Sequence, residues 1–241
     1  MVYSSTTNDK IKNIKKLNEK KYRDITDLFL IEGEHLVTEA YKNNNLKTLI
    51  VEENYNFQLA TETIIATKSV LKYISKLDHP PKVMGICYKR KKGRIGNKVL
   101  ILDNVQDPGN LGTIIRSALA FNIDTIILGE DCVDLYNPKV LRSTQGMIFA
   151  IDIIIENLYD IIPYLKQQGH KILVTNLNGG NDVKTIEKNN KFAIIVGNEG
   201  QGVKKDIINL SDESIFIKMN SKCESLNVGV ATGIILYELD K

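Results

Sequence analysis

The sequence predicts an α/β protein in which a mostly parallel sheet is preceded by a smaller α/β domain. The first observation is that, from Val99 onwards, short apolar runs alternate with segments of helical spacing. This order is typical of a parallel sheet covered by helices on both faces. The second observation is that three of the apolar runs lead into loops of small and polar residues. Ligands of α/β proteins bind at such strand ends, so these loops predict a pocket.

The first part of the chain supplies the elements of a small domain. Leu36, Val37 and Ala40 recur at the spacing of a helix that packs one side on a core. Residues 89–97 contain two glycines and no apolar periodicity, which predicts a linker. We therefore expect one domain at 1–92 and another at 93–241. The expected elements of the first domain are a charged helix at 9–20, strands at 28–31, 49–51, 64–66 and 83–88, and helices after Gly33 and at 70–77.

In the second domain each apolar run is an expected strand. Gly229 and Gly233 lie one turn apart on the last helix, where they would permit close approach of a neighbouring backbone. The alternative is that they merely weaken an ordinary helix. The expected strands are 99–102, 125–128, 151–155, 172–174, 192–196 and 214–217, and the expected helices begin near Leu111, pass through 140–141, and cover 158–165, 203–209 and 226–239.

The net charge of +3 conceals an asymmetry between the two parts. Residues 1–98 contain 19 Lys and Arg against 11 Asp and Glu, a net charge of +8, and the rest of the chain carries −5. Much of the excess lies at 10–23 and 89–98. A basic part joined to an acidic part is typical of a polyanion-binding module attached to a catalytic one. A solvated helix face and a polar linker would give the same charge, so composition leaves both interpretations open.

Composition also argues against several classes of protein. No apolar stretch approaches the roughly 18 residues of a membrane span, and residues after Met1 lack the apolar centre of a signal peptide. The cysteines are far apart and odd in number, which predicts reduced thiols in a cytosol. The histidines form no ligand spacing with each other or with cysteine. We therefore expect a cytoplasmic protein without a metal. These residues are Cys87, Cys132, Cys223, His35, His79 and His170.

The first polar loop runs from Asn104 into a helix. Asp107-Pro108-Gly109-Asn110 is a turn sequence, because Pro restricts φ and Gly permits positive φ. Asn110 is expected to cap the helix that begins at Leu111. The apolar residues that follow form the buried side of that helix and leave Arg116 on its polar side. By itself this predicts only a surface arginine, which is the usual fate of a helical Arg.

The second and third loops have their own chemistry. Glycines at 197–202 let main chain approach a ligand closely, although the loop has neither the Gly-Lys-Ser/Thr of a P-loop nor a Gly-x-Gly-x-x-Gly pattern. Glu199 could simply favour the dipole of the helix at 203–209. Ser225 could simply cap the last helix. Asn227 within the first turn is harder to explain, since Asn is a mediocre helix former.

In order and spacing these loops resemble the three signature motifs of the SpoU (TrmH-like) RNA 2'-O-methyltransferases of the SPOUT class. The resemblance covers roughly 99–239, and the pattern Asn-x-x-Asp-Pro-x-Asn-x-Gly-x-x-x-Arg is its most specific part. Lys218 stands where the family usually has Pro. The resemblance implies a SPOUT domain with a C-terminal trefoil knot, S-adenosylmethionine bound in the knot, and a homodimer formed by knot-region helices.

The first domain carries a second, less specific resemblance. The pattern from Lys20-Lys21-x-Arg23 to Glu32-Gly33-Glu34 is similar to the substrate-binding domain that precedes many SpoU catalytic domains. Those domains resemble a small RNA-binding fold found among ribosomal proteins. The resemblance implies RNA contacts at Lys20, Lys21, Arg23 and Arg142.

The resemblance also assigns residues to the catalytic site. It implies cofactor contacts at Gly197, Asn198, Ile217, Met219, Leu226 and Leu177. It implies catalytic positions at Arg116, Asn110, Glu199, Ser225 and Asn227.

Arg116 is the position that the family holds to be catalytic. An arginine stays protonated, with a pKa above about 12, and is therefore a poor general base. We expect it to hold the phosphate of the target and to stabilise the developing alkoxide. Proton removal by the arginine itself would need a special environment. Alignment of the activated methyl group with the hydroxyl is expected to supply much of the acceleration.

The sequence therefore predicts an S-adenosylmethionine-dependent RNA ribose 2'-O-methyltransferase, with large-subunit (23S) ribosomal RNA as the expected substrate. A tRNA 2'-O-methyltransferase and a methyltransferase that confers antibiotic resistance on the ribosome are alternatives within the same class. An RNA-binding protein that has lost catalysis is the alternative from another class, and the intact polar motif residues argue against it. A doubly wound dehydrogenase or nucleotide enzyme is disfavoured by the missing phosphate-loop patterns.

Overall fold

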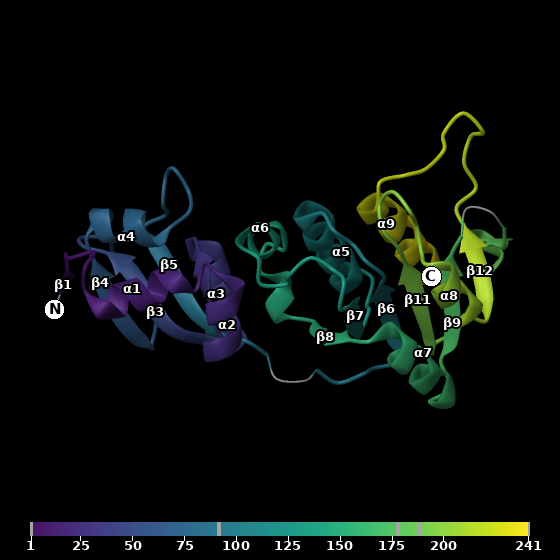
Figure 1. The fold of residues 1–241 in the computed structure, drawn as a ribbon, viewed down its shortest axis with the longest axis horizontal. Coiled ribbons are helices and arrows are strands. Elements are labelled where there is room, and N and C mark those ends of the chain that lie inside the picture. Colours follow the sequence, from purple (N-terminus) through teal and green to yellow (C-terminus); the bar gives the residue numbers. More distant parts are fainter. Residues whose placement is uncertain (1, 91–92, 177–178, 188, 241) are drawn as a thin grey trace. The chain divides into compact units, whose positions relative to one another are not determined.

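The computed structural model describes residues 2–90, 93–176, 179–187 and 189–240 (Figure 1). It forms two compact units, Met1–Lys91 with Asp134–Phe149, and Lys92–Val133 with Ala150–Lys241. Segment 134–149 packs in the first unit, although in sequence it lies between two strands of the second. The assignment of separate functions to 1–92 and 93–241 stays a prediction.

The described part of the first unit has a five-stranded mixed sheet of order β1-β4-β3-β5-β2. Strands β1, β4 and β3 are parallel, and β5 is antiparallel to β3 and β2. The elements are β1 (Val2–Tyr3), α1 (Asp9–Lys16), α2 (Lys20–Thr26), β2 (Leu28–Glu32), α3 (Glu34–Lys42), β3 (Leu46–Glu52), β4 (Glu62–Ala66), α4 (Lys68–Ile74), β5 (Val83–Tyr88), α6 (Pro138–Ser143) and the 3₁₀ helix η1 (Met147–Phe149).

The expected helix at 9–20 is in fact two helices. Helix α1 ends at Lys16 and α2 begins at Lys20, with Glu19 in an extended conformation between them. The side-chain amide of Asn18 donates to the carbonyls of Lys15 at 3.1 Å and Ile74 at 2.7 Å. Such bonds from Asn compete with a continuous helical backbone, which explains the break.

Two layers cover the sheet of the first unit. Helices α1 and α4 pack on one face, where residues such as Ile14 and Leu71 share a core with Ile50 and Met84. The opposite face carries α3 and segment 134–149. There the ring of Phe29 lies 4.6 Å from that of Tyr136 and 6.3 Å from that of Phe149, centroid to centroid. Segment 134–149 therefore supplies part of the core of this unit.

The described part of the second unit has a seven-stranded sheet of order β10-β12-β9-β11-β6-β7-β8. All its neighbouring strands are parallel, which confirms the predicted fold class. Strand β10 was not predicted, because Asn and Asp give no apolar signal. The elements are β6 (Lys98–Leu102), α5 (Pro108–Ala120), β7 (Thr125–Gly129), β8 (Asp152–Glu156), α7 (Leu158–Gln167), β9 (Lys171–Thr175), β10 (Asn181–Asp182), η2 (Val183–Thr185), β11 (Phe192–Val196), α8 (Lys205–Asn209), β12 (Glu213–Phe216) and α9 (Val228–Leu239).

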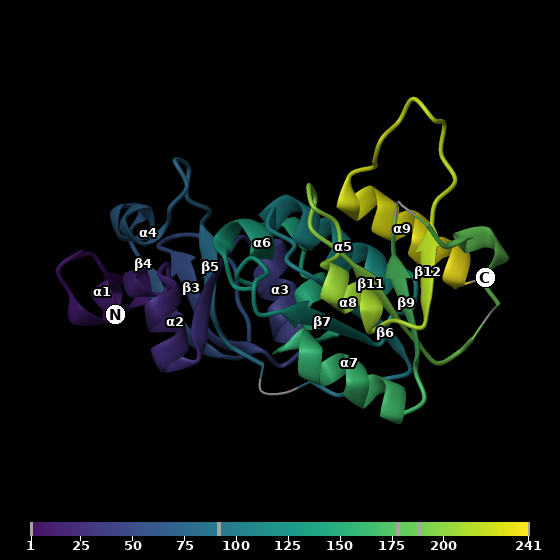
Figure 2. The same ribbon diagram turned by 45° about the vertical axis from the view of Figure 1, so that its right-hand side comes forward.

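Helices cover both faces of this sheet. Val99 and Ile101 of β6 share a core with Leu158 of α7 and Ile207 of α8. Neighbouring strand residues point the other way, towards the face where α5 and α9 lie side by side (Figures 1 and 2). The expected trefoil knot stays a prediction.

Two glycines of α9 face α5. A Cβ at Gly229 would lie 3.2 Å from the side chain of Thr113, which is a tight contact, and one at Gly233 would lie 3.6 Å from the Ser117 hydroxyl, which is an ordinary one. Of the two, Gly229 is therefore the position where α5 comes close enough to favour glycine.

Candidate active site

The three polar loops lie at the carboxyl edge of the parallel sheet. The first loop (103–107) follows β6 and continues into the first turn of α5, which contains Asn110. The second loop (197–204) follows β11, and the third loop (217–227) follows β12 and leads into α9. Strands β6 and β11 are direct neighbours, and β9 lies between β11 and β12. Because carboxyl ends of parallel strands share one edge, loops far apart in sequence can meet there.

A chain of hydrogen bonds joins all three loops. The Asn227 side-chain amide donates to Asn110 Oδ1 at 2.8 Å, and the Asn110 amide donates to Glu199 Oε1 at 3.0 Å. The Glu199 carboxylate also accepts from the backbone N–H of Gln106 at 3.3 Å and of Asp107 at 3.1 Å. We call Asn227, Asn110 and Glu199 the amide relay.

The start of α9 fixes the direction of the relay. Asn227 Oδ1 accepts from the backbone N–H of Gly229 at 3.0 Å and of Val230 at 3.3 Å, as a helix cap does. Its NH₂ group is therefore the end that faces Asn110. Asn110 must then present its oxygen to Asn227 and its NH₂ to Glu199. Each amide has one orientation that satisfies its neighbours.

The caps of α5 and α9 differ from those expected. Asp107 caps α5 by accepting from the backbone N–H of Asn110 at 2.8 Å, so the helix begins at Pro108. The expectation that Asn110 is the cap is wrong, and its side chain is free to join the relay. Asn227 caps α9, which begins at Val228. Ser225 lies outside the helix in the exposed part of the third loop.

The environment of Glu199 favours its charged form. Burial opposes ionisation, but the hydrogen bonds that the carboxylate accepts from Asn110 and from backbone N–H groups outweigh it, and the pKa of Glu199 is lowered. Glu199 is therefore an acceptor at neutral pH and holds donors from the first loop. It is not poised to donate a proton.

The second loop is a closed turn that packs against the first. Asn198 and Gly202 exchange two backbone hydrogen bonds of 3.0 Å. The Asn198 amide donates to the carbonyl of Asn104 at 2.9 Å. A Cβ at Gly197 would lie 2.2 Å from the backbone of Gly202, so only glycine fits there. The turn folds back on its own first residue.

The structure places the other predicted residues as follows. Arg116 is exposed on α5 and, among the described residues, has no hydrogen bond or ion pair. Ile217, Met219 and Leu226 are half-buried in the third loop, which Figure 2 shows extending away from the sheet before α9. Leu177 lies outside the described residues. The structure thus brings Gly197, Asn198 and the amide relay together, and it does not place Arg116 or Ser225 in contact with them.

The predicted RNA-binding residues fall into two groups. Lys20 and Lys21 are exposed on α2, and Arg142 is half-buried on α6. Arg23 is 4% exposed, and its guanidinium pairs with Asp134 and donates to the carbonyl of Leu17 at 2.9 Å. The structure gives Arg23 an internal role, so we leave it out of the proposed RNA surface.

Asp103 and Lys204 support the second loop from behind the site, although the sequence did not point to them. The buried Asp103 carboxylate accepts from the backbone N–H of Lys204 at 2.8 Å. Asp103 looks like the polar end of an apolar strand, and Lys204 looks like an ordinary surface lysine. The signal that the sequence offered was an acidic residue, Asp103, directly after an apolar run.

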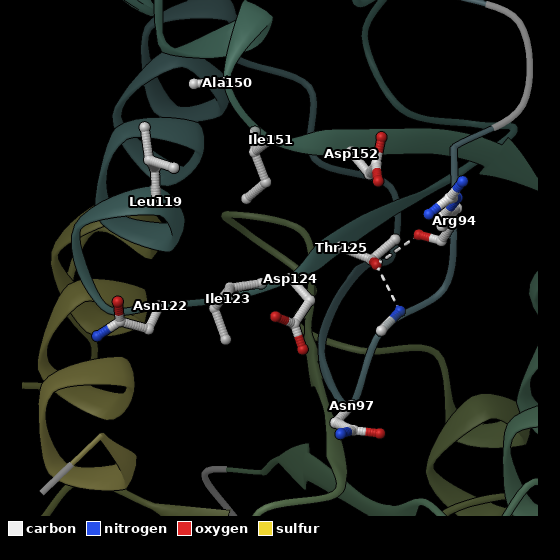
Figure 3. A pocket seen from close by; sticks show the side chains of 11 residues that line it. Arg94, Asn97, Leu119, Asn122, Ile123, Asp124, Thr125, Ala150, Ile151 and Asp152 are labelled. Carbon is white, nitrogen blue, oxygen red and sulfur yellow. Dashed lines mark hydrogen bonds between the residues drawn. The ribbon is translucent and has the colours of Figure 1, made fainter.

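A separate cavity lies at the opposite edge of the sheet (Figure 3). Its volume is about 610 Å³, and it is surrounded by the amino ends of β6, β7 and β8. The Thr125 hydroxyl there donates to the carbonyl of Arg94 and accepts from the backbone N–H of Gly96. None of the loop residues discussed above lines it. The lining residues are Arg94, Gly96, Asn97, Leu119, Asn122, Ile123, Asp124, Thr125, Ala150, Ile151 and Asp152.

The described residues lack two further features, a metal-ligand cluster and a membrane-spanning helix. Within 2–90, 93–176, 179–187 and 189–240, no three His, Cys, Asp or Glu side chains come together as a metal site would require. In the same ranges no helix has both the length and the apolar character needed to cross a membrane.

Comparison with known proteins gives a family. The model of the SpoU rRNA Methylase family matches residues 97–237, and that of the MRM3-like substrate binding domain matches residues 8–85. The chain belongs to the SpoU rRNA methylase family. This confirms the family and the N-terminal substrate-binding domain inferred from the sequence.

Individual relatives match over nearly the whole chain. The chain is 38% identical to the 23S rRNA (guanosine(2553)-2'-O)-methyltransferase RlmP of Bacillus subtilis, across 98% of this chain and 97% of that protein. The AdoMet-bound rRNA methyltransferase from Sinorhizobium meliloti superposes with a TM-score of 0.87 at 31% identity, over 99% and 97% of the two chains. AviRb from Streptomyces viridochromogenes shares the fold, with a TM-score of 0.87 at 23% identity over 97% of each chain.

The second loop fits S-adenosylmethionine, the cofactor of this family. A Cβ at Gly202 would meet no atom within 4 Å, and one at Gly200 would meet only Asn198 Oδ1 at 3.7 Å. The outer side of the loop is therefore open, and a ligand can approach its main chain without an intervening side chain. The half-buried Ile217, Met219 and Leu226 supply apolar surface in the third loop.

Proposed function

We propose that this protein transfers a methyl group from S-adenosylmethionine to a ribose 2'-hydroxyl of 23S ribosomal RNA in the cytoplasm. The observation that carries the proposal is the amide relay, which joins the three motif loops of an rRNA methylase family at one edge of the sheet. The match to RlmP over nearly the full length of both chains favours large-subunit rRNA over tRNA. It also makes the guanosine methylated by RlmP the first nucleotide to examine.

The residues of the site divide the work. The bound cofactor supplies an activated methyl group. Arg116, exposed and without a partner among the described residues, is available to hold the target phosphate and to stabilise charge that develops on the ribose oxygen. Gly197, Asn198, Ile217, Met219 and Leu226 contact the cofactor. The amide relay holds the three loops together. Ser225, in the third loop, is the remaining member of the proposed catalytic set.

A direct experiment tests the reaction. Ribose methylation would be mapped across all rRNA and tRNA from cells with and without this protein, and the purified protein would be supplied with cofactor and the unmodified RNA. We expect one 2'-O-methylated nucleotide of 23S rRNA to disappear in the deletion strain and to be restored in vitro. Loss of a tRNA methylation instead would establish the alternative substrate. An unchanged methylation map would refute the proposal.

RNA binding is proposed for the exposed lysines of α1, α2 and α4, which we call the lysine layer. Four of these lysines lie over aromatic rings. In the two shortest contacts Lys15 Nζ is 3.7 Å from the ring centre of Tyr73 and Lys16 Nζ is 5.4 Å from that of Tyr22. Helix α3, on the sheet face opposite α1 and α4, carries Glu34, Glu39 and a single lysine. Lysines bind phosphates, and tyrosine faces can stack on unpaired bases. The exposed lysines of the layer are Lys10, Lys12, Lys15, Lys16, Lys20, Lys21, Lys68 and Lys72.

The RNA surface is best tested in the full-length chain, because segment 134–149 packs against residues 1–91 and a fragment would lose it. Replacing Lys15, Lys20 and Lys21 with Gln should weaken RNA binding and reduce the slope of log affinity against log salt by about 1 per lysine. The matched control replaces three lysines outside the layer. Equal losses in both variants would show that the layer is not the RNA surface. The control lysines are Lys42, Lys47 and Lys82.

A homodimer through α9 is the remaining part of the proposal. Val230, Ile234 and Tyr237 are 52%, 37% and 53% exposed and follow one another at helical spacing along α9. An exposed apolar stripe on a helix beside the active loops suits a second copy of the chain. Light scattering should give twice the mass of the chain, and Ile234→Glu should give the mass of one chain. A wild-type monomer at micromolar concentration would rule out the dimer.

A further inference from the structure

Asp103 is a buried carboxylate for which the methyl-transfer chemistry has no direct use. It follows β6 directly, is 2% exposed, and its own N–H continues the sheet by donating to the carbonyl of Val196 at 2.9 Å. A buried carboxylate is costly unless hydrogen bonds compensate it. The compensation comes from Lys204, whose backbone N–H donates to Asp103 Oδ2 at 2.8 Å and whose ammonium lies 3.6 Å from Oδ1.

This bond holds the far end of the second loop. The near end of the loop is fixed by β11 and by the Asn198 amide, which donates to the carbonyl of Asn104. Lys204 is the last residue before α8, so the Asp103 bond ties the exit of the loop to the residue that precedes Asn104. Both ends of the turn are thereby attached to two consecutive residues of the first loop.

The packing inside the turn makes the position of its main chain depend on the position of Lys204. A Cβ at Gly197 would lie 2.2 Å from the backbone of Gly202 and 2.3 Å from that of Val203, so a displacement of residue 204 would move the chain that lies beside Gly197. The hydrogen bond that fixes the exit comes from the backbone N–H of Lys204, so it does not depend on the side chain at position 204. The Lys204 ammonium also pairs with Asp131 at 2.7 Å, which orients the side chain at the surface.

We propose that Asp103 is a positioning residue for the cofactor: its carboxylate fixes the exit of the second loop and so keeps the ligand-facing main chain of that loop in place. The inference rests on the proposed function, in which the second loop binds S-adenosylmethionine. Asp103 touches neither cofactor nor RNA. Its effect is carried by the position of the loop.

The molecule contains a matched control at the other edge of the sheet. Asp212 accepts from the backbone N–H of Ile172 at 2.8 Å and pairs with Lys166 at 2.6 Å. The bond is of the same type and length as that of Asp103, but it holds the beginning of β9, and the Asp212 side chain is 39% exposed against 3% for Asp103. A purely structural role for Asp103 therefore predicts a larger loss of stability than for Asp212, with no selective change in cofactor affinity or in the protection of the second loop.

The experiment compares Asp103→Ala with Asp212→Ala in the full-length protein. Calorimetry gives the Kd for S-adenosylmethionine, and amide hydrogen exchange without cofactor gives the protection of residues 198–204. We expect both variants to melt at lower temperature. Only Asp103→Ala should bind cofactor at least tenfold more weakly and lose protection in the second loop. Equal cofactor affinity in the two variants would overturn the proposal.

Two more variants separate the backbone clamp from the ion pair and from misfolding. Asp103→Asn retains an oxygen that can accept from the Lys204 N–H, so its cofactor affinity should stay within about threefold of wild type. Lys204→Ala retains the backbone N–H and should also bind nearly normally. A tenfold loss in both, at unchanged loop protection, would assign the effect to charge and refute the clamp. Wild-type protein that shows loop protection but binds no cofactor would refute the proposed function instead.

Discussion

The two edges of the seven-stranded sheet contain the same kind of bond in different settings. At the amino edge, Asp124 accepts from the backbone N–H of Lys98 at 2.8 Å, and Asp212 accepts from that of Ile172 at 2.8 Å. At the carboxyl edge, Asp103 accepts from the backbone N–H of Lys204, also at 2.8 Å. The amino edge also has the 610 Å³ cavity of Figure 3. Neither this type of bond nor a cavity distinguishes the functional edge, although Asp103 is buried whereas Asp124 and Asp212 are exposed.

The difference lies in what the bonds connect. At the amino edge each carboxylate holds the first residues of a strand that the sheet already pairs. At the carboxyl edge, the relay of Asn227, Asn110 and Glu199 connects three loops that strand pairing does not hold together. A buried polar network is costly unless each of its polar groups has a hydrogen-bond partner. A network that joins three loops outside the sheet therefore indicates that the relative positions of these loops matter for function. We expect substitutions at the carboxyl edge to change cofactor affinity or methylation rate, and substitutions at the amino edge to change neither.

The largest effect is expected from Arg116→Ala. Removing a donor aimed at developing negative charge costs about 10²–10³ in rate, and we expect a loss of this size in single-turnover methylation at saturating enzyme and cofactor. Melting temperature should hardly change, because exposed residues usually contribute within about 0.5 kcal/mol. Arg116→Lys should also be poor, since Lys lacks the planar fork. Arg94→Ala, an exposed arginine at the amino edge, is the control. Equal rates in the two alanine variants would remove Arg116 from the mechanism.

A pair of glycines in one loop tests the shape of the cofactor site. Gly197→Ala places a Cβ 2.2 Å from backbone atoms of Gly202, and forcing main chain apart typically costs about 1–3 kcal/mol. We expect cofactor affinity to fall about tenfold or more and the melting temperature to drop. Gly200→Ala places a Cβ near Asn198 Oδ1 alone, at an ordinary contact distance of 3.7 Å, and is the control for stability: its melting temperature should stay nearly unchanged. A cofactor affinity that is insensitive to Gly197→Ala would place the cofactor away from this turn.

Asn227→Asp tests the direction of the relay. An aspartate still caps α9, but it presents an acceptor to Asn110. If Asn110 turns to donate to position 227, its oxygen then faces Glu199, so one repulsive pair remains in either orientation. We expect the methylation rate to fall about tenfold and stability to fall by about 1 kcal/mol. Asn157→Asp is the control, because Asn157 caps α7 by accepting from Tyr159 N–H at 2.9 Å and serves no loop. A similar response of both variants would reduce Asn227 to a cap.

The sequence predicted the sheet and the loops because these depend on local chemistry. Turn formers after an apolar run predict a loop wherever the rest of the chain lies. It failed where two residues offer the same local chemistry: Asp107 and Asn110 can both cap a helix, as can Ser225 and Asn227. Only the backbone path decides between them.

Contacts between residues far apart in the sequence were the other limit on prediction. Arg23 was expected at the RNA surface, yet it is buried against Asp134, which lies 111 positions away in sequence. Segment 134–149 packs in the first unit although it is flanked by strands of the second. No periodicity encodes either contact. Asp103 has the same limit, because its partner is the backbone of Lys204 and a backbone N–H leaves no trace in sequence.

The smallest effect, and the finest test of the comparison, concerns pH. Hydrogen bonds from Asn110 and backbone N–H groups overcome the effect of burial and lower the pKa of Glu199, while bonds from Lys171 and Asn181 lower the pKa of Glu213 near the amino edge. A carboxyl whose folded pKa is depressed stabilises the fold fully above its unfolded pKa, and this stabilisation is lost as pH falls through the folded value. Wild type should therefore lose stability in acid below the ordinary glutamate range of about 4.3, and both Glu199→Gln and Glu213→Gln should make that loss shallower.

The pH dependence of cofactor affinity should distinguish Glu199 from Glu213. In wild type this affinity should decline over the same acid range, because protonated Glu199 releases the first loop from the second. Glu213→Gln should keep that decline, and Glu199→Gln should be weaker at neutral pH and flat in acid. Cofactor affinity measured from neutral pH downwards decides the matter, and a decline that persists in Glu199→Gln would mean that another group at the carboxyl edge controls the loops.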